Sequence, residues 1–166
     1  MRMTVIVVMG VSGSGKTTVG TALAKELGTV YAEADTFHPR ANIEKMTAGH
    51  PLNDEDRAPW LAAIAEWIAK HHENGAVVSS SALKRRYRDV LRGGGDVWFL
   101  HLQGSRDLLA ERMKTRSGHF MPVSLLDSQL ADLEPLEADE PGATFDISRP
   151  PADLVASALK AFQERA

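Results

Sequence analysis

The stretch that decides the fold class reads Val5-Ile6-Val7-Val8-Met9-Gly10-Val11-Ser12-Gly13-Ser14-Gly15-Lys16-Thr17. Its first part is apolar and rich in β-branched residues, which predicts a short buried strand. The part that follows completes the pattern G-x-x-x-x-G-K-[ST], in which backbone N–H groups and a lysine surround phosphates. We therefore expect a strand, a phosphate-binding loop and a helix in that order.

The chemistry of this loop favours a nucleoside triphosphate. Its glycines let the backbone curl with N–H groups pointing inward, and the helix that begins at Lys16 adds a positive dipole end. Lys16 can reach the β- and γ-phosphates, and the Thr17 hydroxyl can bind Mg²⁺. The alternative is a glycine-rich turn without a ligand. The residues expected to contact ATP are Gly10, Val11, Ser12, Gly13, Ser14, Gly15, Lys16, Thr17 and Thr18.

Composition places the chain among compact soluble proteins. Its 166 residues are 43% hydrophobic and 25% charged, which suits a single domain over 1–166. The net charge of −3 gives no basic footprint for nucleic acid, and no apolar run reaches the roughly 20 residues that span a bilayer. We expect neither nucleic acid nor membrane as a partner. The absence of cysteine and of a signal-peptide cleavage site suits the cytoplasm.

Apolar runs alternate with helical patterns along the chain. Strands are expected at 4–9, 30–34, 76–80, 97–103 and 144–147, and helices at 16–27, 56–72, 84–92, 105–116 and 152–164. This alternation predicts an α/β fold whose parallel sheet is covered by helices on both faces. The segments 35–55 and 117–142 interrupt it, and there we expect a substrate cleft and a mobile lid.

Two carboxylates follow the second expected strand. Glu33 and Asp35 stand two residues apart, so both can point toward the crevice beyond the carboxyl ends of the strands. Asp35 could take the proton of an attacking hydroxyl, and Glu33 could hold a water on Mg²⁺. A helix cap or surface turn is the alternative for either residue.

An arginine stands on the apolar face of the helix expected at 56–72. Arg57 falls three residues before Trp60, and a guanidinium there needs an anion or a polyol to bind. Asp54 as N-cap and Asp56 in the first turn are what any helix could use. Trp60 could stack on a substrate, or it could simply belong to the core.

Further cations follow the later strands. Lys84 stands nearest the end of the third strand and is a candidate for binding substrate or phosphate, whereas the arginines after it suit a solvated face. Arg112 and Arg116 lie one turn apart and can face the cleft together. Such a pair suits a base or a transferring phosphoryl group, with complementarity to the helix dipole as the alternative.

Longer motifs resemble one kinase family. They are Asp35-x-x-His38-Pro39-x-x-Asn42-x-x-Lys45-Met46-x-x-Gly49-x-Pro51-Leu52-x-Asp54-x-Asp56-Arg57-x-Pro59-Trp60-Leu61, then Ser81-Ala82-Leu83-Lys84, then Arg112-x-x-x-Arg116-x-x-His119-Phe120-Met121-Pro122. Together they resemble the gluconokinases, which make 6-phosphogluconate from D-gluconate and ATP. The resemblance covers nearly the whole chain, and the string from His38 to Leu61 is more specific than the phosphate loop.

The resemblance implies a fold similar to the shikimate and nucleoside monophosphate kinases, a three-layer α/β/α P-loop kinase fold with a five-stranded parallel sheet. It implies a substrate-binding region near 36–72, a lid near 117–133 and a homodimer. Lys16, Asp35 and Arg116 would be catalytic, and Glu33 would join Thr17 at the metal, although relatives usually carry Asp there. ATP would also contact Arg112, Arg116 and Pro150, with Arg149 and Pro151 as neighbours. Gluconate would contact Asp35, His38, Asp54, Arg57, Trp60, Lys84 and His119.

The expected reaction is transfer of the γ-phosphoryl group of ATP to the 6-hydroxyl of D-gluconate. Another small-molecule kinase of this fold, acting on shikimate, a nucleoside monophosphate or another sugar acid, is the nearest alternative. A GTPase-like switch is a further one, but the chain has no N-K-x-D, and its D-x-x-G, at 139–142, comes too late.

Overall fold

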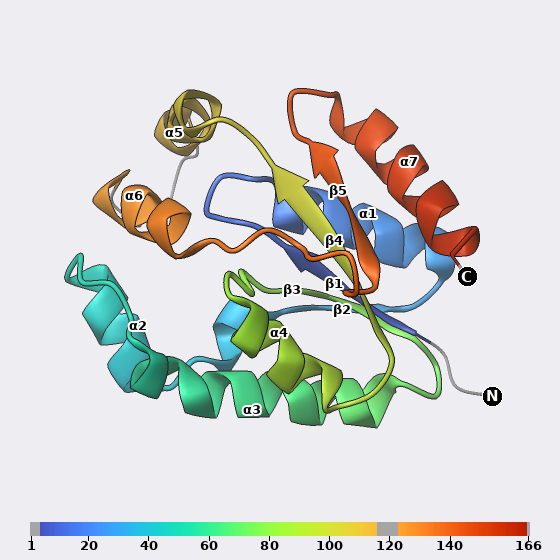
Figure 1. Ribbon diagram of the computed structural model, residues 1–166, viewed down its shortest axis with the longest axis horizontal. Helices are drawn as coiled ribbons and strands as arrows, with labels where there is room; N and C mark the ends of the chain where they lie inside the picture. The colour runs from blue at the N-terminus through green and yellow to red at the C-terminus, as the bar shows by residue number, and fades with distance from the viewer. Residues whose placement is uncertain (1–3, 116–122, 166) are drawn as a thin grey trace.

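The computed structural model describes residues 4–115 and 123–165 (Figure 1). Its elements are β1 (Val5–Met9), α1 (Lys16–Leu27), β2 (Val30–Glu33), the 3₁₀ helix η1 (Ala34–Phe37), α2 (Arg40–Thr47), α3 (Asp54–His71), β3 (Ala76–Ser79), α4 (Arg85–Arg92), β4 (Val97–Gln103), α5 (Arg106–Thr115), α6 (Val123–Asp132), β5 (Gly142–Asp146) and α7 (Pro151–Gln163). Strands and helices alternate as expected.

The five strands form one sheet in the order β2-β3-β1-β4-β5, and all neighbouring pairs are parallel. β1 is central, with Val7 in register with Val78 of β3 and with Phe99 of β4. The strand order therefore switches at β1, because β2 and β3 lie on one side of it and β4 and β5 lie on the other. In an open parallel sheet ligands bind at such a point, beyond the carboxyl ends of the strands.

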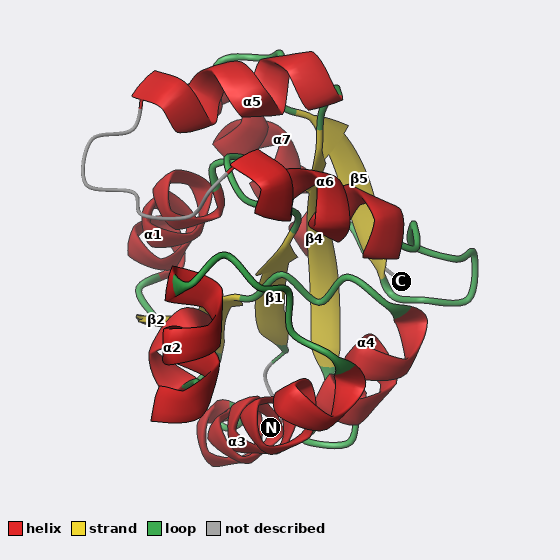
Figure 2. Ribbon diagram, turned by 90° about the vertical axis from the view of Figure 1, so that its left-hand side faces the viewer, coloured by secondary structure: helices red, strands yellow, loops and turns green. Residues whose placement is uncertain are grey.

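Alternate residues of β1 enter two separate cores. Ile6 and Val8 pack with residues of α1 and α7, whereas Val5, Val7 and Met9 pack with residues of α3 and α4. Because a strand buried on both faces has no solvated side, all five of its residues are apolar and buried. Helices thus cover both faces of the sheet, and α6 lies beside α5 near the carboxyl ends of the strands (Figure 2).

The structure differs from the expectations mainly in the two interrupting segments. The first holds η1 and α2, and the second holds α6, none of which the sequence pattern predicts. β5 begins at Gly142, earlier than the expected strand at 144–147. A Cβ there would lie 2.2 Å from the Phe99 carbonyl oxygen, so glycine, which usually interrupts strands, is needed for this close pairing.

The two ends of the described chain meet at the edge of the sheet opposite the phosphate loop. Arg165, just after α7, donates a hydrogen bond of 3.0 Å from Nη2 to Thr4 Oγ1, just before β1. Its guanidinium carbon also lies 3.8 Å from the centre of the Phe162 ring. Within the described ranges, no helix has the length and apolarity that crossing a membrane requires.

Candidate active site

The phosphate loop curls around its own lysine. Lys16 Nζ donates to the carbonyl oxygens of Gly10 at 2.8 Å and Val11 at 3.3 Å. Gly13 and Gly15 have φ angles of 85° and 90°, which L-residues with side chains rarely adopt. The loop therefore holds an ammonium group beside the helix N-terminus, as binding a phosphate requires.

A chain of hydroxyl groups positions Glu33 beside the loop. Thr17 Oγ1 donates to Glu33 Oε1 at 2.5 Å, and the Tyr31 hydroxyl donates to the same oxygen at 2.8 Å. Burial raises the pKa of Tyr31 above its usual range, so its hydroxyl keeps the proton it donates. Mg²⁺ prefers oxygen ligands and usually takes only one or two of them from the protein, so this hydroxyl and carboxylate fit it.

A pocket lies directly beyond Lys16, between the phosphate loop and the helices of the first interrupting segment. Its polar walls come from distant parts of the chain, since Asp35 of η1, Arg57 of α3 and Ser81 after β3 all contribute. The full lining is Ser12, Lys16, Asp35, His38, Met46, Pro51, Leu52, Arg57, Trp60, Ser81, Leu83, Leu125, Ser128 and Gln129. The phosphate-binding lysine and the candidate base therefore share one pocket.

One wall of this pocket is built on a stacked aromatic pair. The rings of His38 and Trp60 lie 4.2 Å apart at 14°, and Trp60 Nε1 donates to the Ala34 carbonyl oxygen at 2.7 Å. The Asn42 amide nitrogen, 3.1 Å from His38 Nδ1, can only donate, so Nδ1 accepts and the proton of the neutral ring lies on Nε2. Burial lowers the pKa of His38 to about 4, which keeps the ring neutral at pH 7.

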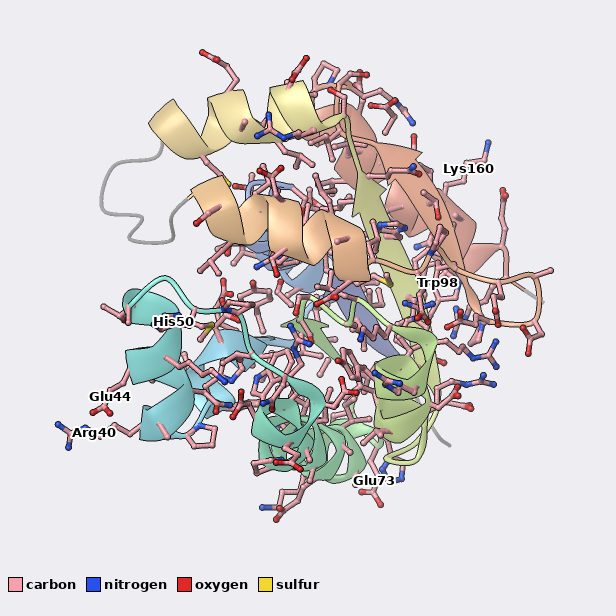
Figure 3. The ribbon with its side chains drawn as sticks, turned by 60° about the vertical axis from the view of Figure 1, so that its left-hand side comes forward. Arg40, Glu44, His50, Glu73, Trp98 and Lys160 are labelled. Carbon is pink, nitrogen blue, oxygen red and sulfur yellow. The ribbon has the colours of Figure 1, made fainter. Side chains whose placement is uncertain are left out.

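Asn42 belongs to the inner side of α2, whose outer side carries charges. Asn42 is 4% exposed and its amide also donates to the Asp56 carbonyl oxygen at 2.7 Å. Arg40 and Glu44 form an exposed ion pair at 3.3 Å and point away from the molecule (Figure 3). α2 thus holds the stacked pair from one side and faces solvent on the other.

Arg57 is the buried cation of the pocket. It is 8% exposed, its Nη1 donates to the Tyr87 hydroxyl at 2.8 Å, and its Nη2 lies 3.6 Å from Asp132 Oδ2 of α6. The Tyr87 hydroxyl in turn donates to Asp54. Hydrogen bonds from Tyr87 and Arg86 hold the pKa of Asp54 below its usual range.

α6 approaches the phosphate loop through a residue that the sequence analysis missed. Gln129 Oε1 accepts a hydrogen bond of 2.8 Å from the backbone N–H of Ser12. The two residues are 117 positions apart, and no motif marks a glutamine in this segment. An apolar period in Val123–Asp132 could have indicated the helix, but not this contact.

A second pocket, of about 250 Å³, opens on the other side of the phosphate loop. Its lining is Gly13, Ser14, Gly15, Thr17, Thr18, Val19, Arg112, Pro151 and Leu154. Arg112 Nη2 donates to the Ile147 carbonyl oxygen at 2.6 Å, which fixes the guanidinium at this opening. Of the neighbouring residues 149–151, Pro151 lines the pocket, while Pro150 caps α7 and Arg149 bonds to Ser157.

The comparisons with known proteins point to one family. Residues 6–121 match the family described as "AAA domain". The gluconokinase of Gluconobacter oxydans is 48% identical over 161 residues, which cover 95% of this chain and 90% of that protein. This chain belongs to the gluconokinase family. The solved structure of a gluconokinase from Sinorhizobium meliloti, 49% identical, has a TM-score of 0.89 and covers 96% of this chain and 91% of that chain. An unliganded sugar kinase from Janibacter, 50% identical, has a TM-score of 0.92, with 97% and 95% covered.

The structure brings most of the candidate gluconokinase residues to two adjoining pockets. Asp35, His38, Arg57 and Trp60 line the first pocket together with Lys16, and Arg112 lines the second. Arg116 and His119, with the expected lid up to 122, lie outside the described residues.

Three residues lie in positions that the sequence pattern does not give. Lys84 and Asp54 stand behind Arg57, outside the lining of the first pocket, with Lys84 Nζ 3.8 Å from Asp54 Oδ1. Asn53, rather than Asp54, caps α3, because its side chain accepts from the Asp56 N–H at 2.8 Å.

The expectation of a solvated cationic face on α4 is wrong for Arg88. This side chain is fully buried, and its Nε and Nη2 donate to the two carboxylate oxygens of Glu140 at 2.6 and 2.8 Å. Its Nη1 donates to the carbonyl oxygen of Ala82, a buried residue with a φ of 42°. The sequence did not indicate this contact because the carboxylate stands 52 residues away.

Proposed function

We propose that this chain transfers the γ-phosphoryl group of ATP to the 6-hydroxyl of D-gluconate, giving 6-phospho-D-gluconate and ADP. The observation that carries the proposal is the shared pocket, in which Lys16 of the phosphate loop and Asp35 at the end of β2 face one cavity. The names of the relatives support gluconate as the acceptor.

Asp35 is the group that would orient the acceptor. Its carboxylate accepts a hydrogen bond from the 6-hydroxyl and takes the proton as the new O–P bond forms. The bond between the γ-phosphorus and its bridging oxygen breaks, and that electron pair leaves with ADP. Because phosphoryl transfer needs mainly positioning and charge stabilisation, Lys16 and Arg116 would contribute most by neutralising phosphate oxygens.

Thr17 and Glu33 would hold Mg²⁺, which when bound neutralises phosphate charge. Tyr31 supports them because its hydroxyl donates to the same Glu33 oxygen as Thr17 does. Glutamate is longer than the aspartate expected in relatives, and its direct hydrogen bond to Thr17 suits a contact with the metal through water.

The remaining assignments concern binding. Arg57 would bind the carboxylate or hydroxyls of gluconate, and His38 and Trp60 would form a neutral aromatic wall beside it. Further contacts to gluconate would come from Asp54, Lys84 and His119. Arg112 and Pro150 or Pro151 would contact the nucleotide. We further propose a single domain over 1–166, a substrate-binding region near 36–72, a lid near 117–133 that excludes water, a homodimer and a cytoplasmic location.

The experiment that tests the reaction is a coupled assay of ADP release with ATP and Mg²⁺. D-gluconate is compared with shikimate, AMP and no acceptor. Turnover with gluconate alone supports the proposal. Turnover with another acceptor keeps the fold and overturns the substrate. ATP hydrolysis that is equally fast with and without gluconate overturns the mechanism, because lid closure and acceptor binding would then not control the transfer.

A further inference from the structure

Tyr87 occupies the central place in a chain of three side chains behind the acceptor pocket. It accepts a hydrogen bond of 2.8 Å from Arg57 Nη1 and donates its own proton to Asp54. The Arg57 guanidinium carbon also lies 5.3 Å from the centre of the Tyr87 ring. The tyrosine is 3% exposed, so this contact is made away from solvent.

The direction of the hydrogen bonds explains why a hydroxyl group, rather than a carboxylate, suits this position beside Arg57. A buried guanidinium has donors and no acceptor, so a neighbour must accept from it. A carboxylate in contact would neutralise it and compete with the carboxylate of a substrate. Tyr87 instead offers a neutral acceptor and passes the bond to Asp54, whose side chain is about half exposed at 51%. The Arg57 guanidinium is thus held in place by a hydrogen bond to a neutral hydroxyl, and its nearest carboxylate, Asp132, stands 3.6 Å away.

The other carboxylate near Arg57 lies farther away. Asp132 Oδ2 stands 3.6 Å from Nη2, beyond a good hydrogen bond, and its side chain is 30% exposed. Lys84 and Arg86 lie on the Asp54 side of the tyrosine, each with its charge 5.7 Å from the ring centre. Asp54 therefore accepts a hydrogen bond from Tyr87 and is paired with two cations other than Arg57. These cations neutralise its carboxylate, so that it neutralises Arg57 less.

We propose that Tyr87 is a positioning residue for the acceptor, which holds Arg57 in the orientation that binds the anionic end of the substrate. Asp54 acts on Arg57 through Tyr87. The inference rests on the proposed function for the identity of the acceptor, and it adds a residue that the sequence motifs did not single out.

The test compares wild type, Tyr87→Phe, Arg57→Ala and the double variant in the ADP-release assay. Phenylalanine keeps the ring and removes only the hydroxyl group, so we expect the fold to be retained. We expect Tyr87→Phe to raise the KM for gluconate by about tenfold, with the KM for ATP and kcat changed less than about twofold. In the Arg57→Ala background the same change should have almost no further effect, because the group it positions is gone.

Two further variants separate the effect of the Tyr87 hydroxyl from a general effect on α4. Asp54→Asn should raise the KM for gluconate in the same direction but less, since an amide oxygen still accepts from the tyrosine. Val90→Ala, on the exposed side of α4, the helix that also carries Tyr87, is the matched control and should change neither KM. An unchanged KM in Tyr87→Phe, an equal rise of both KM values, or full additivity with Arg57→Ala overturns the proposal. Absence of gluconate turnover in wild type overturns the proposed function instead, before any variant is compared.

Discussion

The phosphate loop and the acceptor pocket adjoin each other but are built in opposite ways. In the loop, Lys16 bonds to carbonyl oxygens five and six residues away. In the pocket, Arg57 bonds to a tyrosine 30 residues away and Trp60 to a carbonyl oxygen 26 residues away. The contacts that hold the phosphate-loop lysine are therefore local in sequence, whereas the acceptor pocket depends on the packing of several helices.

Substitutions in the two regions should therefore have different effects. A change in the loop removes a phosphate contact and leaves the scaffold intact. A change behind the pocket acts through the positions of α3, α4 and α6, so it should affect stability or the affinity for the acceptor.

The largest expected effect is on the scaffold behind the pocket. Arg88→Met leaves the Glu140 carboxylate buried without its partner, so we expect the free energy of unfolding to fall by about 3–5 kcal/mol. Chemical denaturation measures this loss, and Arg92→Met, exposed on the same helix, is the control. A loss below about 1 kcal/mol would mean that the ion pair does not hold α4 to the segment around Glu140.

The phosphate loop should show the reverse behaviour. Lys16→Met removes the ammonium that meets the transferring group, so we expect kcat to fall about 10³-fold while the thermal midpoint changes little. Steady-state kinetics and a melting curve on the same sample measure both. A large loss of stability with modest loss of kcat would break the contrast between the two regions.

Asp35 should matter for rate more than for binding. Asp35→Asn keeps the size of the side chain and removes the proton acceptor, so we expect kcat to fall about 10²-fold with a KM for gluconate changed only a few-fold. Asp153→Asn, exposed in the first turn of α7, is the control for the same chemical change. A kcat within twofold of wild type would exclude Asp35 as the base.

Gln129 joins the two regions, so its removal should affect both substrates. Gln129→Ala deletes the acceptor for the Ser12 N–H, and we expect each KM to rise about fivefold. The exposed Gln163→Ala on α7 is the matched control. A rise in one KM alone would assign α6 to one substrate and contradict its bridging position.

The effect that is smallest at neutral pH concerns the titration of His38. The pKa of His38 lies near 4 in the folded chain, below its ordinary value of 6.5, because the ring is buried. Unfolding then takes up about one proton at this side chain between those values, so stability falls as the pH drops through that window and is unaffected above it. Proton NMR of the imidazole measures the folded pKa. A value above 6 would contradict the neutral stacked ring on which the pocket wall depends.

The sequence predicted the parts of the molecule whose structure depends on residues that are close together in the chain. β1, the loop and α1 were confirmed, since an apolar run, three glycines and a lysine act within Val5–Leu27. Arg57 was correctly expected on the buried face of its helix, because periodicity alone places it there. The resemblance supplied the family, which the comparisons confirmed.

Contacts between distant segments could not be predicted in the same way. The partner of Arg88, the tyrosine behind Arg57 and the glutamine on the loop all depend on tertiary packing. The helices α2 and α6 were missed because proline, glycine and acidic residues around them are typical of loops. The placements of Arg116 and His119 remain predictions, since both lie outside the described residues.

The contact between Thr4 and Arg165 has a practical consequence for handling this enzyme. Both residues lie at the end of the sheet where β1 begins, whereas the two pockets are lined by the phosphate loop, which follows the opposite end of β1. A fused reporter or a surface tether attached beside either residue would point away from both substrates. The same proximity would let a short linker join the two residues without crossing the end of the sheet that carries the pockets.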